Sequence, residues 1–195
     1  MTIATSPRST AVSPKPRTRR ITGEELLAMG DIGPCELIEG RIVPMTPAGS
    51  EHGVIESNLG RHLGNFVVDR KLGKVMNGEV GIFTRRRPDS VRGADIAFVS
   101  RERLADRPAK GFLTVAPELV VEIVSPSDRW QEMRQEIEEY FAIGVQRVWI
   151  VEPDNRDVLV YSASTEMRKL GEGDLLTGEG VLEGFSLPVT QLFEE

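Results

Sequence analysis

The sequence predicts an α/β (α+β) domain in which helices pack on a central β-sheet. Two amphipathic helical segments, several short β-branched segments and an early alternating hairpin pattern indicate this class. The 195 residues suit one compact domain, long enough to bury a core without disulfides or structural metal. The single Cys35 excludes a disulfide framework and a Cys-rich zinc site.

The chain begins with a basic tail, residues 1–20, rich in Ser, Thr, Pro and Arg. It has too few apolar residues to offset the entropy of ordering, so we expect it to be disordered and residues 21–195 to form the single domain. The tail lacks the apolar region of a secretory signal, and no run of about 18 apolar residues exists to span a membrane. We therefore expect a cytoplasmic protein without a membrane partner.

The first elements predicted after the tail are a short helix and a hairpin. Residues 21–29 form a helix capped by Thr22, with Glu25 at the capping-box position. Residues 35–45 alternate around a turn at Glu39-Gly40, which predicts an N-terminal β-hairpin.

Two longer helices follow from apolar residues at helical spacing. Residues 47–71 form the first, with Ser50 as the candidate N-cap and an apolar stripe of Val54, Ile55, Leu59, Leu63, Phe66 and Val67. Residues 127–143 form the second, closed by Gly144, with a stripe of Trp130, Met133, Ile137, Tyr140 and Phe141.

Short β-branched segments fill the intervals between and after these helices. We expect two strands around a turn at Gly78, a half-buried strand, a strand buried on both faces, and two strands around a turn at residues 152–156. Their ranges are 75–77, 79–84, 94–100, 119–124, 148–151 and 158–161. The chain then ends in short strands and turns.

The charge of the chain is unevenly distributed. A net charge of −6 argues against a nucleic-acid partner, but the tail carries +5 and residues 85–110 carry a local +4. One interpretation of this basic zone is a solvated charged loop. The other is a phosphate-facing patch, since clustered Arg side chains neutralise phosphates locally, with these candidate DNA contacts: Arg85, Arg86, Arg87 and Arg92.

Two carboxylates stand in otherwise apolar strand segments. Asp95 and Glu122 would be costly to bury unless paired, hydrogen-bonded or bound to a cation. On neighbouring strands they could hold a hard divalent metal, which would generate a hydroxide nucleophile and offset phosphate charge. One alternative is that Glu122 pairs with Arg147. A glycosidase acid and base pair is a weaker alternative, because the chain has two Trp and two Tyr with which to stack sugars.

A set of strings resembles a known family. The sequence is similar to the restriction endonuclease family that is widespread in cyanobacteria and other bacteria, within the restriction-endonuclease-like PD-(D/E)XK superfamily. The resemblance covers about residues 21–193 and is carried by Glu36-Leu-Ile-Glu-Gly40, Arg92-Gly-Ala-Asp-Ile-Ala-Phe-Val99, Leu119-Val-Val-Glu-Ile-Val-Ser-Pro-Ser127, Glu139-Tyr140 with Gly144-Val145, and Val148-Trp-Ile-Val-Glu-Pro153.

The resemblance implies a mixed central sheet flanked by helices and an endonuclease, dependent on Mg²⁺ or Mn²⁺, that hydrolyses phosphodiester bonds in DNA. It implies metal binding by Asp95, Glu122 and the backbone carbonyl of Ile123. Glu36 and His52 match recurrent positions and become supporting candidates. Analogy with restriction enzymes also favours a homodimer.

The sequence departs from the family pattern at the expected lysine. The position two residues after the second acid is Val124, and the displaced position, four residues before Tyr140 on the helix, is Glu136. Arg134 is the nearest cation on that helix, at a different helical phase. Glu136 joins Asp95 and Glu122 as a candidate catalytic carboxylate but cannot stabilise phosphate charge as a lysine would. The alternatives are a degraded nuclease-fold protein that binds nucleic acid or regulates, and a scaffold whose acids only pair with arginines.

Overall fold

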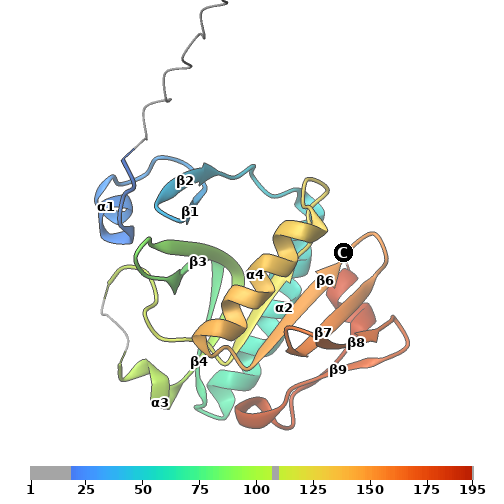
Figure 1. The fold of residues 1–195 in the computed structure, drawn as a ribbon. Coiled ribbons are helices and arrows are strands. Elements are labelled where there is room, and N and C mark those ends of the chain that lie inside the picture. Colours follow the sequence, from blue (N-terminus) through green and yellow to red (C-terminus); the bar gives the residue numbers. More distant parts are fainter. Residues whose placement is uncertain (1–18, 107–109, 195) are drawn as a thin grey trace, which may run out of the picture.

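In the computed structural model, the described residues are 19–106 and 110–194 (Figure 1). The predicted tail lies outside them except for its last two positions, and so does Arg107 of the basic zone. Within the described residues, no helix combines the length and the hydrophobicity needed to cross a membrane.

Eight strands form one mixed central sheet, as predicted. Their order is β2-β1-β4-β5-β6-β7-β8, with β3 paired to the other side of β4. β5 and β6 are parallel, and the other pairings between these strands are antiparallel. The strands are β1 (Cys35–Ile38), β2 (Arg41–Pro44), β3 (Gly73–Arg85), β4 (Ser90–Ser100), β5 (Leu119–Ile123), β6 (Arg147–Glu152), β7 (Asp157–Ala163) and β8 (Glu166–Leu170).

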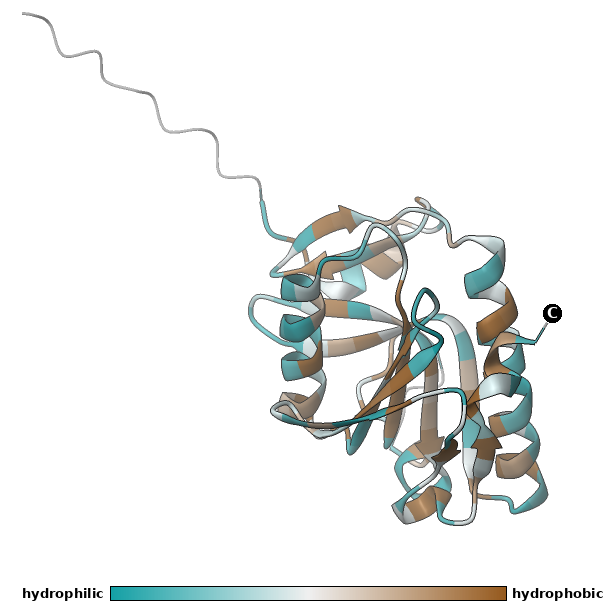
Figure 2. Ribbon diagram, turned by 90° about the vertical axis from the view of Figure 1, so that its right-hand side faces the viewer, coloured by the Kyte–Doolittle hydropathy of each residue, from teal (hydrophilic) through white to brown (hydrophobic). Residues whose placement is uncertain are grey.

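The two long helices cover opposite faces of this sheet, and apolar residues concentrate in the strands between them (Figures 1 and 2). α2 (Ser50–Asp69) packs Ile55, Leu59, Leu63 and Val67 against one core, which includes Phe98, Val121 and Ile123. α4 (Trp130–Ile143) packs Met133, Ile137 and Tyr140 against the other, which includes Ala97, Val120 and Ile150.

Smaller elements complete the chain around the sheet. They are α1 (Gly23–Ala28), α3 (Arg101–Leu104), a two-stranded sheet of β9 (Leu175–Thr177) and β10 (Ser186–Pro188), and the 3₁₀ helices η1 (Gly180–Leu182) and η2 (Val189–Phe193). The observed architecture confirms the predicted fold class.

Several local predictions are confirmed and others are corrected. Thr22 and Glu25 form the capping box of α1, and the β1–β2 turn places Glu39 and Gly40 at positive φ. The N-cap of α2, however, is Gly49, without a side-chain cap, because the helix already includes Ser50. Trp130 is 43% exposed instead of joining the buried stripe, because it is the first residue of α4.

The two strands expected around Gly78 are one strand, β3, with a bulge. The register to β4 shifts between Asn77 and Val80, and both Gly78 and Glu79 have positive φ. The Gly78 N–H donates to the Glu56 carboxylate at 2.8 Å, so α2 secures the bulge. A bulge inserts a residue without ending the strand, which is why an alternation pattern breaks there as if at a turn.

The central strand β4 is where the sheet divides. β3 pairs with β4 along one side at both Val91 and Ile96. On the other side, β1 pairs with β4 at Val91 and β5 pairs with it only from Ile96 onward. The interval between these pairings, residues 92–95, therefore has no strand along that side, and we call it the fork.

Candidate active site

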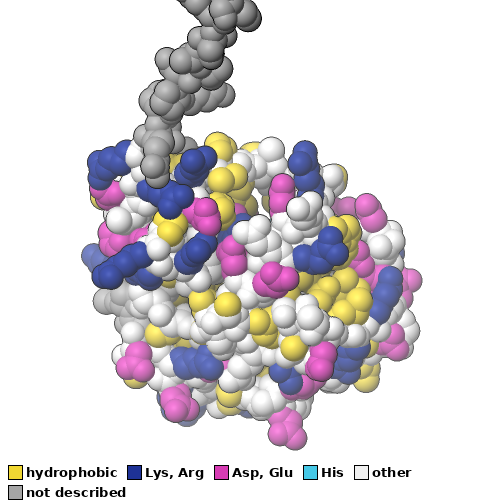
Figure 3. Space-filling view, in the orientation of Figure 1, with side chains coloured by type: hydrophobic (Ala, Val, Ile, Leu, Met, Phe, Trp, Pro, Cys, Tyr) yellow, Lys and Arg dark blue, Asp and Glu magenta, His cyan; other side chains and the backbone are white. Residues whose placement is uncertain are grey.

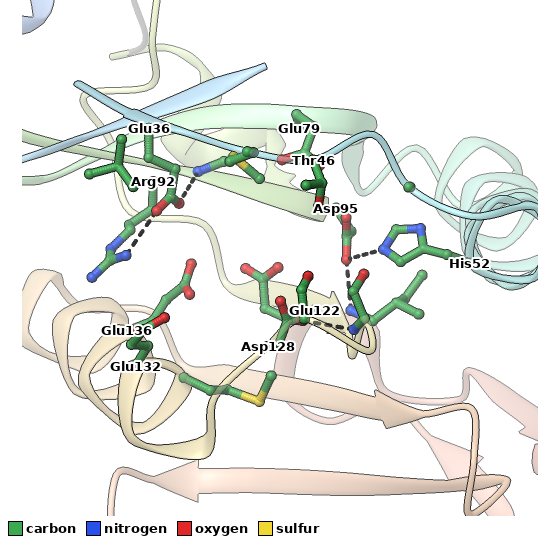
Figure 4. Close-up of a pocket in the computed structure, with 18 of the residues that line it drawn as sticks. Glu36, Thr46, His52, Glu79, Arg92, Asp95, Glu122, Asp128, Glu132 and Glu136 are labelled. Atoms are coloured by element: carbon green, nitrogen blue, oxygen red, sulfur yellow. Dashed lines mark hydrogen bonds and ion pairs between the residues drawn. The ribbon is translucent and has the colours of Figure 1, made fainter.

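A cavity of about 330 Å³ lies against the fork. The end of β5 (Glu122 and Ile123), the first turns of α2 and α4, and the segment after β2 surround it. Acidic side chains dominate its lining and converge on it from several elements (Figure 4): Glu36, Glu79, Asp95, Glu122, Asp128, Glu132 and Glu136. The structure thus brings the predicted Asp95, Glu122, Glu136, Glu36, His52 and Ile123 to one cavity.

Asp95 is 5% exposed and is held by two donors from other elements. Its Oδ2 accepts a hydrogen bond from the Ile123 N–H at 2.7 Å and lies 3.2 Å from the His52 Nε2. His52 is near the start of α2, and its hydrogen bond with Asp95 raises the pKa of the imidazole against the opposing effect of burial. This carboxylate therefore replaces a strand carbonyl as the partner of a β5 amide at the fork.

Glu122 and Glu136 meet at the hydroxyl of Tyr140. The Tyr140 Oη lies 2.7 Å from Glu122 Oε1 and 2.9 Å from Glu136 Oε1, and the tyrosine is fully buried. Burial and the neighbouring Glu136 raise the pKa of Glu122 well above its ordinary value. Burial and Glu36 raise the pKa of Glu136 to about 8. The alternative in which Glu122 pairs with Arg147 is wrong, because the Arg147 Nε binds Glu179 at 2.9 Å.

Glu36 also completes the fork from the β1 side. Its Oε1 accepts the Gly93 N–H at 3.0 Å, and its Oε2 accepts Arg92 Nη1 at 2.9 Å. Arg92 donates in addition to both carboxylate oxygens of Glu139, at 2.8 and 3.1 Å. Arg92 is 7% exposed, so it is not the free surface cation that we expected. It ties β4 to the hairpin and to α4.

Other arginines of the basic zone also pair with carboxylates. Arg85 pairs with Glu39 at 2.6 Å, and Arg86 pairs with Glu24 at 2.8 Å. In contrast, Arg87 is exposed and forms no ion pair within the described residues. Basic and acidic side chains are interspersed on the face shown in Figure 3. On this face, the described residues do not form one continuous basic surface.

Several residues near the cavity were missed by the sequence prediction, among them Glu79, Tyr140 and Arg129. Glu79 reaches it from the β3 bulge, where a charged residue after glycine in an alternating strand was the available signal. Tyr140 was assigned only to the core, although it lies four residues after Glu136 on one helix face. Arg129, just before α4, is exposed at the rim of the cavity, and its Nη1 lies 3.9 Å from the Glu132 carboxylate.

The oxygen-rich lining is not a preformed cage of many ligands. Among residues 19–106 and 110–194, no three Asp, Glu, His or Cys side chains are close enough, as they stand, to hold a metal ion. Asp95 on β4 and Glu122 on β5 come from neighbouring strands, and the Ile123 N–H, next to Glu122 in the chain, binds Asp95.

Residues 24–190 match the family Uma2, described as "Putative restriction endonuclease". The chain belongs to this family. The match confirms the resemblance of the sequence to that restriction endonuclease family. No curated protein matches the chain significantly.

A solved crystal structure shares the fold of this Uma2 family member. It is a "putative nuclease belonging to DUF820" from Anabaena variabilis, with a TM-score of 0.75 and 23% sequence identity. The alignment covers 89% of this chain and 97% of that chain. At this identity the likeness establishes the fold, a mixed sheet flanked by helices, that places the acidic cavity.

Proposed function

We propose that this protein is an endonuclease that hydrolyses phosphodiester bonds in DNA with the help of Mg²⁺ or Mn²⁺. The observation that carries the proposal is the convergence of Asp95 and Glu122 on one cavity at the fork, in a member of a restriction endonuclease family. Adjacent strands supply the two carboxylates, so the sheet fixes their separation. The cavity offers a concave site with partly buried acids of perturbed pKa, which is typical of active sites.

The donor chemistry of this site fits a hard divalent cation. Carboxylate oxygens of Asp95 and Glu122, with the backbone carbonyl of Ile123, are oxygen ligands of the kind that Mg²⁺ prefers. Mg²⁺ usually keeps several waters and binds proteins through one or two carboxylates, so a cluster of three acidic ligands is not required. Burial and, after it, neighbouring carboxylates raise the pKa of Glu122 and Glu136, and a cation would relieve the repulsion between them.

Such a cation would supply a hydroxide nucleophile near neutral pH and stabilise the negative charge of the phosphate. The protein residues would orient the reacting groups around it. Asp95 and Glu122 would hold the cation, and Tyr140 would keep Glu122 and Glu136 facing the cavity. Arg129, with its long exposed side chain at the rim, would attract the DNA phosphate.

Isosteric substitutions test this function directly. We expect Asp95→Asn and Glu122→Gln to abolish Mg²⁺- or Mn²⁺-dependent cleavage of plasmid and linear DNA. Glu138→Gln, on the exposed face of α4, should retain it. Wild-type protein that leaves single-stranded, duplex and branched DNA intact with either metal would refute the proposal.

A second candidate function is a nuclease fold that has lost its chemistry and binds or regulates. The observation that favours it is the lining of the cavity. Among the described residues, that lining contains Glu136 at the expected lysine position and does not contain a lysine. Glu136→Lys separates the two candidates. A large gain in cleavage would identify a degraded enzyme, whereas an active wild type that this substitution weakens would exclude degradation.

A further inference from the structure

We propose that His52 is a positioning residue that fixes which oxygen Asp95 presents to the cavity. The inference rests on the proposed function, because it concerns how a metal-binding carboxylate is oriented. It assigns His52 no contact of its own with metal or DNA.

Two donors from different elements meet at a single oxygen of Asp95. The Ile123 N–H of β5 and the His52 Nε2 of α2 both reach Oδ2, at 2.7 and 3.2 Å. Within the described residues, the side-chain hydrogen bonds of Asp95 both end on Oδ2, which leaves Oδ1 for the cavity. Without the imidazole, the carboxylate would be held by one donor and could rotate about its terminal bond.

The imidazole is itself rigidly placed. The side chains of His52 and Asp95 are 9% and 8% exposed, so both are shielded from competing water. His52 lies in the first turn of α2, and Ile55 and Leu59 of the same helix are buried in the core. The helix therefore carries the ring to Asp95 as a fixed support (Figure 4).

The two ring nitrogens have different surroundings, which defines how the ring acts. Nε2 faces the Asp95 carboxylate, so the neutral ring must carry its proton there in order to donate. Nδ1 is buried and has no hydrogen-bond partner among the described residues. His52 therefore works through Asp95, in the way that outer-shell partners orient metal ligands.

The chain offers a matched set of variants on one helix. His52→Leu removes the donor and keeps an apolar side chain, whereas His52→Gln retains an N–H at similar reach. The other histidine of the chain, His62, lies in α2 outside the cavity, so His62→Leu is the control. Unfolding midpoints of all variants report whether each is folded.

Mn²⁺ binding to the full chain, measured by calorimetry without DNA, is the first readout. We expect His52→Leu to weaken binding by about 10- to 100-fold, as loss of an outer-shell partner does, and His52→Gln to restore most of it. His62→Leu should bind as wild type does. Imidazole ¹⁵N spectra give the second readout: Asp95→Asn should shift the His52 resonances and leave those of His62 unchanged.

The outcomes separate this inference from the proposed function. If wild type and His52→Leu bind Mn²⁺ with equal affinity, the positioning role is overturned and the metal site stands. A wild type that neither binds Mn²⁺ nor cleaves DNA would overturn both. If His52→Leu does not fold, the same decision comes from the ¹⁵N spectra, because unchanged His52 resonances in Asp95→Asn would contradict the contact itself.

Discussion

Tyr140 has one hydroxyl proton and two carboxylate neighbours. The contacts to Glu122 and Glu136 are both of hydrogen-bond length, and a phenol can donate to only one of them at a time. The second contact is favourable when that carboxyl group carries a proton. This agrees with the raised pKa of both glutamates, and it makes the tyrosine the link between β5 and α4 at the site.

Tyr140→Phe should therefore destabilise the protein without disturbing the packing of the ring. We expect a loss of about 1–3 kcal/mol in the free energy of unfolding, because two partly buried carboxyl groups lose a partner. Tyr161→Phe, at a partly exposed tyrosine, should change it by less than about 0.5 kcal/mol. Urea unfolding of both variants measures the difference, and equal effects would contradict the linking role.

Glu136 makes the stability of the metal-free protein depend on pH. Its folded-state pKa of about 8 lies above the ordinary value of 4.5, so folding favours the protonated form. Its contribution to stability is complete below the lower value and is lost as pH rises through the higher one. Wild type with chelator should therefore become less stable across this window. Glu136→Gln should show a weaker dependence in urea unfolding, and parallel pH profiles would exclude the assignment.

The sequence predicts individual site residues only where a charged residue interrupts an apolar strand segment, since burying it there would cost free energy. Asp95 and Glu122 interrupt apolar strands, so their presence in a site could be inferred from burial alone. The partners of Arg92 could not, because Glu36 and Glu139 lie far from it in the sequence and meet it only through the fold. A cluster of arginines likewise gives the local charge but does not reveal which carboxylates neutralise it.

At the scale of elements, turn and cap chemistry made the short pieces predictable. The capping box of α1 and the Glu39-Gly40 turn follow from local residues, and both are observed. The β3 bulge was not predictable as such, because an interrupted alternation has the same appearance for a turn and for an inserted residue. Only pairing with β4 on both sides of Gly78 distinguishes them.

Glycine substitutions in the α2 helix and at the β3 bulge should have opposite effects on stability. In α2, a Cβ at Gly64 would meet nothing within 4 Å, so Gly64→Ala should stabilise by about 0.5–1 kcal/mol through helix propensity. Gly78 has a φ of 83°, so Gly78→Ala should destabilise by about 1–2 kcal/mol. Thermal unfolding measures both, and a stabilised Gly78→Ala would show that the bulge relaxes without cost.

At the scale of the whole molecule, metal binding should appear as added stability. A ligand that binds only the folded state, at 100 times its dissociation constant, adds about 2.7 kcal/mol. Saturating Mg²⁺ or Mn²⁺ should therefore raise the melting temperature of wild type and not that of Asp95→Asn. An equal rise in both would place the bound ion elsewhere.

The structure also changes what the net charge of the chain implies about DNA binding. Acidic side chains line the cavity, while arginines of the basic zone form ion pairs with carboxylates elsewhere in the protein. We therefore expect DNA binding to need a divalent cation in the cavity more than it needs the zone at 85–110.

A homodimer stays a prediction, which sedimentation velocity can check.

Because of the fork, backbone amides of this domain should differ in their protection against hydrogen exchange. Within the ladders, exchange requires strands to separate, whereas the Gly93 amide donates to the Glu36 side chain and the Ile123 amide to that of Asp95. Beyond the fork, Leu37 of the hairpin packs in a separate small apolar cluster with Leu26 of α1 and Val91 of β4. Local openings at this junction should therefore expose the two site amides long before the sheet itself comes apart.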